Sequence, residues 1–381
     1  MSGDDARAPR GVGTRVVRAG HPGPGQGEPF LPGPVFAAPF HASGDPADVP
    51  YSYARYAHPT SERYEAALGE LEHAEAVLFA SGMAAAAALL LTELGPGDAL
   101  AIDESCYLGV RRLARTQLEP RGVELRLAPA ASLAEVVDGA RVLWLETPSN
   151  PKLEVYDIAA LAAAGRRAGA VTVVDNTTAG PLLQRPLDLG ADLVMTSATK
   201  QLAGHADLIL GYLTTRDPDR ARRLRDWRRD SGSIPGPFEA WLAHRSLPTL
   251  ALRLERGCAS AQALAELLVG RDDVPAVHYP GLTTDPGHEA ARRQMQGGFG
   301  MVVSFELASA EAAERFLAAA ELVDDATSFG SVYTTAERRA RWGGDDVSPG
   351  FIRLSAGCEE TADLLADVER ALDVAGGRRH A

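Results

Sequence analysis

Short apolar runs alternate with helix-like segments through the first half of the chain, and this alternation predicts its architecture. The apolar runs predict strands at residues 99–102, 123–127, 142–145, 171–174, 193–195 and 208–210. Helical patterns lie between several of these runs, at residues 107–119, 133–137 and 158–168. Short apolar strands that alternate with helices are typical of a mostly parallel sheet with helices on both faces. The pattern therefore predicts an α/β domain.

The rhythm of the sequence changes near residue 250. Residues 250–269 form one long amphipathic helical pattern, which we expect to link two domains. Beyond it we expect strands at 301–307 and 352–354 and helices at 310–320 and 361–374. At the other end, residues 19–50 are rich in Gly, Pro and Ala and predict an extended arm. We therefore divide the chain into an N-terminal arm (1–50), a large α/β domain (51–250) and a smaller α+β domain (251–381).

Composition narrows the classes of function. The net charge of −13 argues against a nucleic-acid surface. No apolar run approaches the roughly 20 residues of a membrane span, and the first residues lack the apolar core of a secretion signal. The three cysteines, Cys106, Cys258 and Cys358, are far apart and fit neither a metal site nor a disulfide framework. We expect a cytoplasmic protein without a structural metal.

Polar side chains follow two successive strands at the point where each strand ends. Asp175 ends the strand 171–174, and Ser197, Thr199 and Lys200 follow the strand 193–195. Ligands of such sheets bind beyond the carboxyl ends of the strands. Pyridoxal phosphate (PLP) needs a lysine for its Schiff base, hydroxyl groups for its phosphate and a carboxylate for its pyridinium nitrogen. This order of residues predicts PLP on Lys200.

The scarcity of lysine strengthens that interpretation. Lys152 is the only other lysine in a chain with 38 lysines and arginines. The alternative is a surface lysine at the start of a helix. No glycine-rich nucleotide-binding motif follows a strand, and no paired Cys/His spacing indicates a metal.

Other candidate residues each allow two interpretations. Gly82 and Met83 follow Ser81 at the start of a helix, where free amides would cradle a phosphate or Ser81 would serve as a plain N-cap. Tyr107 would stack on the cofactor ring or pack in the core. Arg353 lies in an apolar strand, where it would bind a substrate carboxylate or form an internal ion pair.

Taken together, ordered motifs from about residue 14 to residue 372 resemble the Cys/Met-metabolism family of PLP enzymes, the trans-sulfuration group. The motifs are Tyr53-Ala-Arg55, Ser81-Gly-Met-Ala-Ala85, Cys106-Tyr107, Glu146-Thr-Pro-Ser-Asn-Pro151, Val174-Asp-Asn-Thr177, Ser197-Ala-Thr-Lys200, Gly236-Pro-Phe238, Tyr279-Pro-Gly-Leu282, Gly298-Phe-Gly300 and Arg353-Leu-Ser-Ala-Gly357. The resemblance implies a fold-type I PLP enzyme, like aspartate aminotransferase, that assembles as a homotetramer of two active dimers.

The resemblance also implies a role for each site residue. Lys200 would carry PLP and move protons, Asp175 would hold the pyridinium and Tyr107 would stack on the ring. Ser197, Thr199 and the amides of Gly82 and Met83 would bind the phosphate, which Tyr53 and Arg55 would reach from the neighbouring subunit. Asn150 would lie near the cofactor oxygen, and Arg353 would bind the substrate carboxylate together with Asn150. Tyr107 or Tyr53 would protonate the leaving group.

Departures from the family pattern lie where the distal end of the substrate would bind. Ser52 stands where members that act on cystathionine often have an acid before the Tyr-x-Arg motif. The segment from Ser328 has Tyr333 at the place of a glutamate, and both Ser328 and Tyr333 are candidates for substrate contact. Gly109 replaces the cysteine usual in methionine γ-lyases, which argues against that activity.

These observations lead to one expected function and two alternatives. We expect a cystathionine γ-lyase-like enzyme that cleaves a C–S bond by α,γ-elimination. The first alternative is γ-replacement on an O-acylhomoserine or a specialised amino acid. The second is a catalytically idle regulatory relative.

Overall fold

The computed structural model describes residues 11–23 and 25–377. Within these residues a seven-stranded sheet has the order β1-β7-β6-β5-β4-β2-β3, and β7 runs antiparallel to both neighbours. Its strands are β1 (Glu75–Phe79), β2 (Ala99–Asp103), β3 (Glu124–Ala128), β4 (Val142–Glu146), β5 (Val171–Asp175), β6 (Leu193–Thr196) and β7 (Gly211–Thr215). The mostly parallel sheet is thus confirmed.

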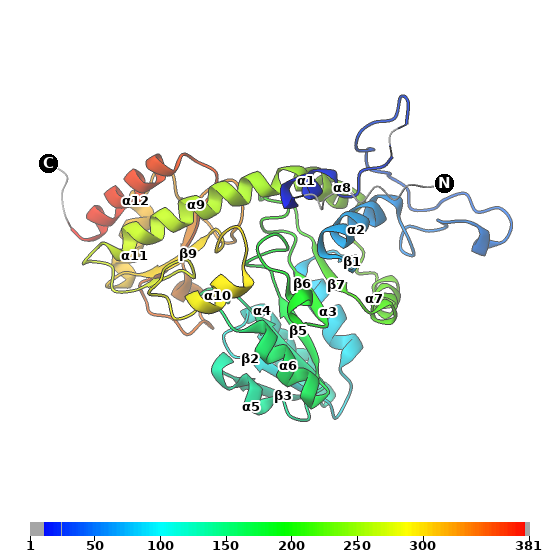
Figure 1. The fold of residues 1–381 in the computed structure, drawn as a ribbon, viewed down its shortest axis with the longest axis horizontal. Helices are drawn as coiled ribbons and strands as arrows, with labels where there is room; N and C mark the ends of the chain where they lie inside the picture. The colour runs from blue at the N-terminus through cyan, green and yellow to red at the C-terminus, as the bar shows by residue number, and fades with distance from the viewer. Residues whose placement is uncertain (1–10, 24, 378–381) are drawn as a thin grey trace.

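Helices cover both faces of this sheet (Figure 1). They are α2 (Pro59–Glu72), α3 (Gly82–Glu93), α4 (Leu108–Leu113), α5 (Leu133–Val136), α6 (Ile158–Ala168), α7 (Pro218–Ser231) and α8 (Pro237–Ser246). Because side chains alternate along a strand, β4 serves both faces. Val142 and Trp144 join the core beneath α3, α4 and α7, whereas Leu143 and Leu145 pack with α5 and α6.

A second sheet follows the long helix α9 (Leu250–Val269), and in the described chain it has the order β10-β11-β12-β9-β8. Its strands are β8 (Val277–His278), β9 (Val302–Glu306), β10 (Asp324–Asp325), β11 (Thr335–Arg338) and β12 (Phe351–Ser355). The accompanying helices are α10 (His288–Gln294), α11 (Ala310–Ala319) and α12 (Thr361–Ala375). In Figure 1, α9 runs from α8 beside the first sheet to α11 and α12 beside the second. The domain boundary at residues 250/251 stays a prediction.

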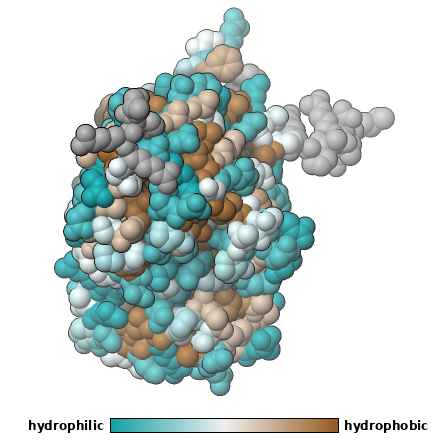
Figure 2. All heavy atoms as spheres, turned by 90° about the vertical axis from the view of Figure 1, so that its left-hand side faces the viewer, coloured by the Kyte–Doolittle hydropathy of each residue, from teal (hydrophilic) through white to brown (hydrophobic). Residues whose placement is uncertain are grey.

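The face on the α11 and α12 side is mostly hydrophilic, with apolar residues in small groups (Figure 2). Helix α12 buries Val368, Ala371 and Leu372, spaced as one apolar face, against the core of the second sheet. Its polar face is therefore left for the surface. No helix of the described residues is long and apolar enough to cross a membrane.

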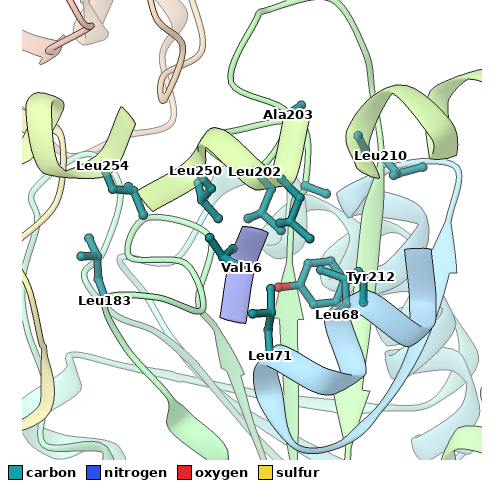
Figure 3. Packing of buried hydrophobic residues seen from close by; sticks show 14 of the residues in the cluster. Val16, Leu68, Leu71, Leu183, Leu202, Ala203, Leu210, Tyr212, Leu250 and Leu254 are labelled. Atoms are coloured by element: carbon teal, nitrogen blue, oxygen red, sulfur yellow. The ribbon is translucent and has the colours of Figure 1, made fainter. Parts of the chain in front are cut away.

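The structure differs from the sequence prediction at the N-terminus. Within the region predicted as an extended arm, residues Val12–Arg18 form helix α1. Val16 is fully buried and points into a cluster with Leu68 and Leu71 of α2 and Leu250 of α9 (Figure 3). The extended chain begins only after α1, where Phe30 and Phe36 are strongly exposed. Figure 1 shows this part of the chain extending away from the body of the protein.

One strand prediction was wrong, and the strand β11 was not foreseen. The apolar residues 208–210 form no strand, and the strand starts at Gly211 instead. The polar strand β11 was not predicted, because its sequence Thr-Ala-Glu-Arg has no apolar run. It pairs antiparallel with β12, and this pairing places Glu337 opposite Arg353.

Candidate active site

A cavity of about 350 Å³ lies at the carboxyl ends of β4, β5 and β6. Its lining includes ten of the predicted site residues, namely Gly82, Met83, Tyr107, Asn150, Asp175, Ser197, Thr199, Lys200, Ser328 and Arg353. They come from segments up to 271 positions apart, counted from Gly82 to Arg353. The fold therefore brings most of the predicted site together.

Lys200 is mostly buried in this cavity. Its Nζ donates a hydrogen bond to Ser328 Oγ at 3.0 Å and lies 5.2 Å from the centre of the Phe329 ring. Burial, and next the charge of Arg353, lower the pKa of Lys200 to about 8, although Asp175 and Glu337 act in the opposite direction. An amine with such a pKa loses its proton easily, which a nucleophile toward a carbonyl carbon requires.

Asp175 ends β5 and is 3% exposed. Its Oδ1 accepts a hydrogen bond from the Thr177 amide at 3.0 Å. Burial raises the pKa of Asp175 to about 6, against the lowering effect of the Thr177 hydrogen bonds and of Lys200. Above that pH the buried carboxylate is charged and favours a cationic partner, as a protonated pyridine nitrogen would be.

The start of α3 fits a phosphate group. Ser81 Oγ caps the Ala84 amide at 3.0 Å, so the predicted N-cap is present. The first amides of a helix have no acceptor within the helix, and Gly82 and Met83, the first two residues of α3, line the cavity. A Cβ on Gly82 would lie 2.8 Å from Ser197 Cβ, so only glycine leaves this cradle open.

Thr199 is already engaged by the backbone. Its Oγ1 donates to the Leu210 carbonyl at 3.1 Å and accepts from the Leu210 amide at 3.0 Å. This is the local role that the sequence left open for a hydroxyl at this position. Its part in phosphate binding stays a prediction.

Glu146, at the end of β4, joins two parts of the site and was not predicted as a site residue. One of its oxygens accepts from the Tyr107 amide and the other from the Asn150 amide, the latter at 3.0 Å. Burial, and next the neighbouring Asp175, raise the pKa of Glu146 well above its usual range. The sequence contains an indication of this role, because Glu146 ends β4 just as Asp175 ends the neighbouring strand β5. The two residues pair in register.

Arg353 is 3% exposed and donates three hydrogen bonds in the cavity wall. It donates to Asn150 Oδ1 at 2.6 Å, to the Ser328 carbonyl at 2.9 Å and to Glu337 Oε1. Burial lowers the pKa of Arg353 to about 10, so it is a cation at neutral pH. The internal ion pair that the sequence allowed is therefore present. Ser328 has a φ of +82°, a strained value for a non-glycine residue.

Three predicted residues lie outside the lining of this cavity. Arg55 donates a hydrogen bond to the Arg229 carbonyl at 3.0 Å. Its guanidinium carbon lies 4.9 Å from the centre of the Tyr56 ring. Tyr53 and Tyr333 have half-exposed side chains. A second cavity of about 750 Å³ shares Thr199 and Ser328 with the first and is not lined by these residues either. Their contacts with cofactor or substrate stay predictions.

The fold and the lysine-centred site define a candidate PLP enzyme, and comparison with known families agrees. The family described as Cys/Met metabolism PLP-dependent enzyme matches residues 36–373. The chain belongs to this family, and its cofactor is PLP. It is an enzyme of sulfur amino-acid metabolism, a lyase or synthase of the trans-sulfuration group.

Individual relatives are similar over almost their whole length. The chain is 51% identical to a protein of Streptomyces coelicolor named "Putative cystathionine gamma-lyase", over 97% of this chain and 96% of the relative. It is 38% identical to the cystathionine gamma-synthase of Mycobacterium tuberculosis, over 95% of this chain and 97% of the relative. The structure of cystathionine gamma synthase from Xanthomonas oryzae pv. oryzae in complex with cystathionine matches with a TM-score of 0.92 at 34% identity. The match covers 98% of this chain and 100% of that structure's chain.

Proposed function

We propose that this enzyme cleaves the γ-carbon–sulfur bond of L-cystathionine by α,γ-elimination, producing L-cysteine, 2-oxobutanoate and ammonia. The observation that carries the proposal is the placement of the Lys200 amine in one cavity with Asp175 and Arg353. The similarity to relatives named as lyases and synthases of cystathionine supports this choice of substrate.

The residues of the cavity divide the work in this proposal. Bound PLP supplies the carbonyl carbon that takes the substrate amine and the electron sink that makes the neighbouring protons acidic. Asp175 holds its ring nitrogen, and the amides of Gly82 and Met83 hold its phosphate. Arg353 binds the substrate α-carboxylate through charge-assisted hydrogen bonds, and Asn150 holds Arg353 in place.

Proton transfer falls to Lys200 and a tyrosine. The Lys200 amine, with its pKa lowered to about 8, removes the proton from the substrate α-carbon, and the ammonium group so formed returns that proton later in the reaction. Tyr107, or Tyr53 of a neighbouring subunit, protonates the leaving sulfur. The second possibility requires a dimer within a homotetramer, which we also propose. A cytoplasmic location is part of the same proposal.

The second candidate is γ-replacement on an O-acylhomoserine. The observation in its favour is that Ser52 and Tyr333 stand where acids would bind the distal amino group of cystathionine, and Tyr333 is half-exposed outside the cavity lining. An acylhomoserine has no distal amino group and would not need those acids.

One assay separates the candidates. PLP-loaded enzyme is mixed with L-cystathionine alone, and 2-oxobutanoate, cysteine, pyruvate and ammonia are measured, with Lys200→Ala as the inactive control. 2-Oxobutanoate with equimolar cysteine supports the lyase. No turnover of cystathionine, but thiol-dependent turnover of an O-acylhomoserine, would replace it with the second candidate. If no amino acid shifts the cofactor spectrum, both proposals fail in favour of an idle relative.

A further inference from the structure

Glu337 is a fully buried carboxylate that contacts Arg353, a residue of the cavity lining, and it is outside the set of site residues predicted from the sequence. It lies in β11, directly opposite Arg353 of β12. Its side chain is 0% exposed and makes an ion pair with Arg353. A charged pair that faces across two strands is a favourable arrangement, and here it places an anion beside the proposed substrate anchor.

Both oxygens of Glu337 accept hydrogen bonds. Oε1 accepts from Arg353 and from Arg339 Nη1, the latter at 2.8 Å, and Oε2 accepts from Trp342 Nε1 at 2.7 Å. Burial alone would raise the pKa of Glu337, but the charges of Arg353 and Arg339 and the hydrogen bonds from Arg339 and Trp342 lower it. Glu337 is therefore an ionised acceptor whose orientation is fixed from several sides.

The residues that hold Glu337 are themselves held. Arg339 Nε donates to Asp345 Oδ2 at 3.1 Å, and Asp345 lies 3.5 Å from Arg111 of α4. Arg111 Nε donates to the Cys106 carbonyl at 2.8 Å, next to Tyr107. This chain of ion pairs links β11 to the start of α4 in the other half of the cavity wall, so Glu337 has little freedom to move.

We propose that Glu337 is a positioning residue that fixes the guanidinium of Arg353 for the substrate α-carboxylate. Two acceptors, Glu337 Oε1 and the Ser328 carbonyl, take hydrogen bonds from the same nitrogen, Nη2, and so set the plane of the group. The inference rests on the role proposed for Arg353. It adds that Arg353 is ready for a carboxylate only while Glu337 holds it.

If Glu337 acted only through its charge, its removal would have the opposite effect on substrate binding. The direction of the change in affinity therefore distinguishes the two explanations. Removing a negative charge beside Arg353 would make the site more positive and tighten the binding of an anionic group. Loss of positioning weakens it. In E337Q one amide NH₂ would have to face a donor, either Trp342 or one of the arginines, so the network loosens although the volume is kept.

The test measures binding of two probes to the PLP-loaded enzyme from the shift in its absorption spectrum. L-2-Aminobutyrate carries the α-carboxylate, and propylamine is the same molecule without it. The variants are E337A, E337Q, R353A and the double variant R353A/E337A. The control is E65Q, because Glu65 forms a buried ion pair with Arg228, with both side chains 8% exposed, outside the cavity lining.

We expect E337A to raise the Kd for L-2-aminobutyrate at least about tenfold, as loss of one partner of a buried charge pair does. E337Q should raise it by a smaller factor, at least about threefold. The Kd for propylamine should stay within about twofold in both, and E337A should add nothing in the R353A background. E65Q should change neither Kd. If E337A does not fold, the isosteric E337Q carries the test.

Several outcomes would overturn the inference, and they separate it from the proposed function. Tighter binding of L-2-aminobutyrate by E337Q would mean that charge outweighs positioning. Equal losses for both probes would reduce Glu337 to a structural role, as would additive effects with R353A. If R353A weakens L-2-aminobutyrate but E337A does not, only the inference fails. If R353A shows no carboxylate-specific loss, the role of Arg353 in the proposed function fails with it.

Discussion

Replacing Asp175 with asparagine should make the cofactor-free protein more stable while it impairs the PLP site. Asp175 is 3% exposed, and its Oδ1 accepts a hydrogen bond from the Thr177 amide. Asparagine keeps an oxygen for that amide and removes the buried charge. Without the cation that PLP would provide, the charge of Asp175 is a cost of folding.

The magnitude follows from the pKa. Burial raises the pKa of Asp175 from 3.8 to about 6. A rise of about two pKa units corresponds to about 3 kcal/mol of unfolding free energy. Below pH 4 the residue is protonated in both the folded and the unfolded chain, so there is no cost. The unfolded chain ionises first, so the cost grows between pH 4 and pH 6 and is complete above pH 6.

The assay is urea unfolding of cofactor-free wild type and Asp175→Asn at equal protein concentration, at pH 5 and pH 8. We expect the variant to be more stable by up to about 3 kcal/mol at pH 8 and by less at pH 5. Asp272→Asn, at an exposed position, controls for the loss of charge. Added PLP should stabilise wild type more than the variant. A variant no more stable than wild type at pH 8 would refute the buried-charge argument.

Three further predictions concern the cofactor site. In the cofactor-free protein, acetylation of Lys200 followed by mass spectrometry should be half-maximal near pH 8, since burial lowers the pKa of this amine to about 8; a midpoint near pH 10 would contradict that. Gly82→Ala should weaken PLP binding about tenfold, because the new Cβ would lie 2.8 Å from Ser197 Cβ, whereas Gly13→Ala has nothing within 4 Å and should not. Arg55→Ala should weaken PLP binding about tenfold if Arg55 reaches the phosphate of a neighbouring subunit, and full PLP occupancy after dialysis would count against that contact.

The fold was predictable where burial leaves a continuous apolar pattern. Helix α9 matches the predicted residues 250–269, and β4 and β5 each extend one residue beyond their predictions. The pattern failed at β7, where Thr214 and Thr215 are buried as partners of Glu72 and of the Asp192 carbonyl. A hydroxyl that is buried with a hydrogen-bond partner has the appearance of a surface residue in the sequence.

The site was predictable where a strand end fixes the position of a residue. Asp175 and Lys200 could be found because parallel strands present their carboxyl ends at one edge of the sheet. Glu146 occupies the equivalent position in β4, so an acidic residue at that strand end also indicates the site. Glu337 gave no such signal, because it becomes a neighbour of Arg353 only through the antiparallel pairing of β11 with β12.

Arg353 shows why the sequence could not decide between a substrate anchor and an internal ion pair. A buried guanidinium needs an acceptor whenever no substrate is bound, because an unpaired buried charge costs several kcal/mol. Glu337 meets that need, and its charge opposes the lowering of the Arg353 pKa by burial, so that the arginine stays protonated with a pKa of about 10. The internal pair is therefore compatible with the substrate role that we propose for Arg353. In our proposal the two interpretations hold together, because Arg353 keeps its ion pair with Glu337 while it binds the carboxylate.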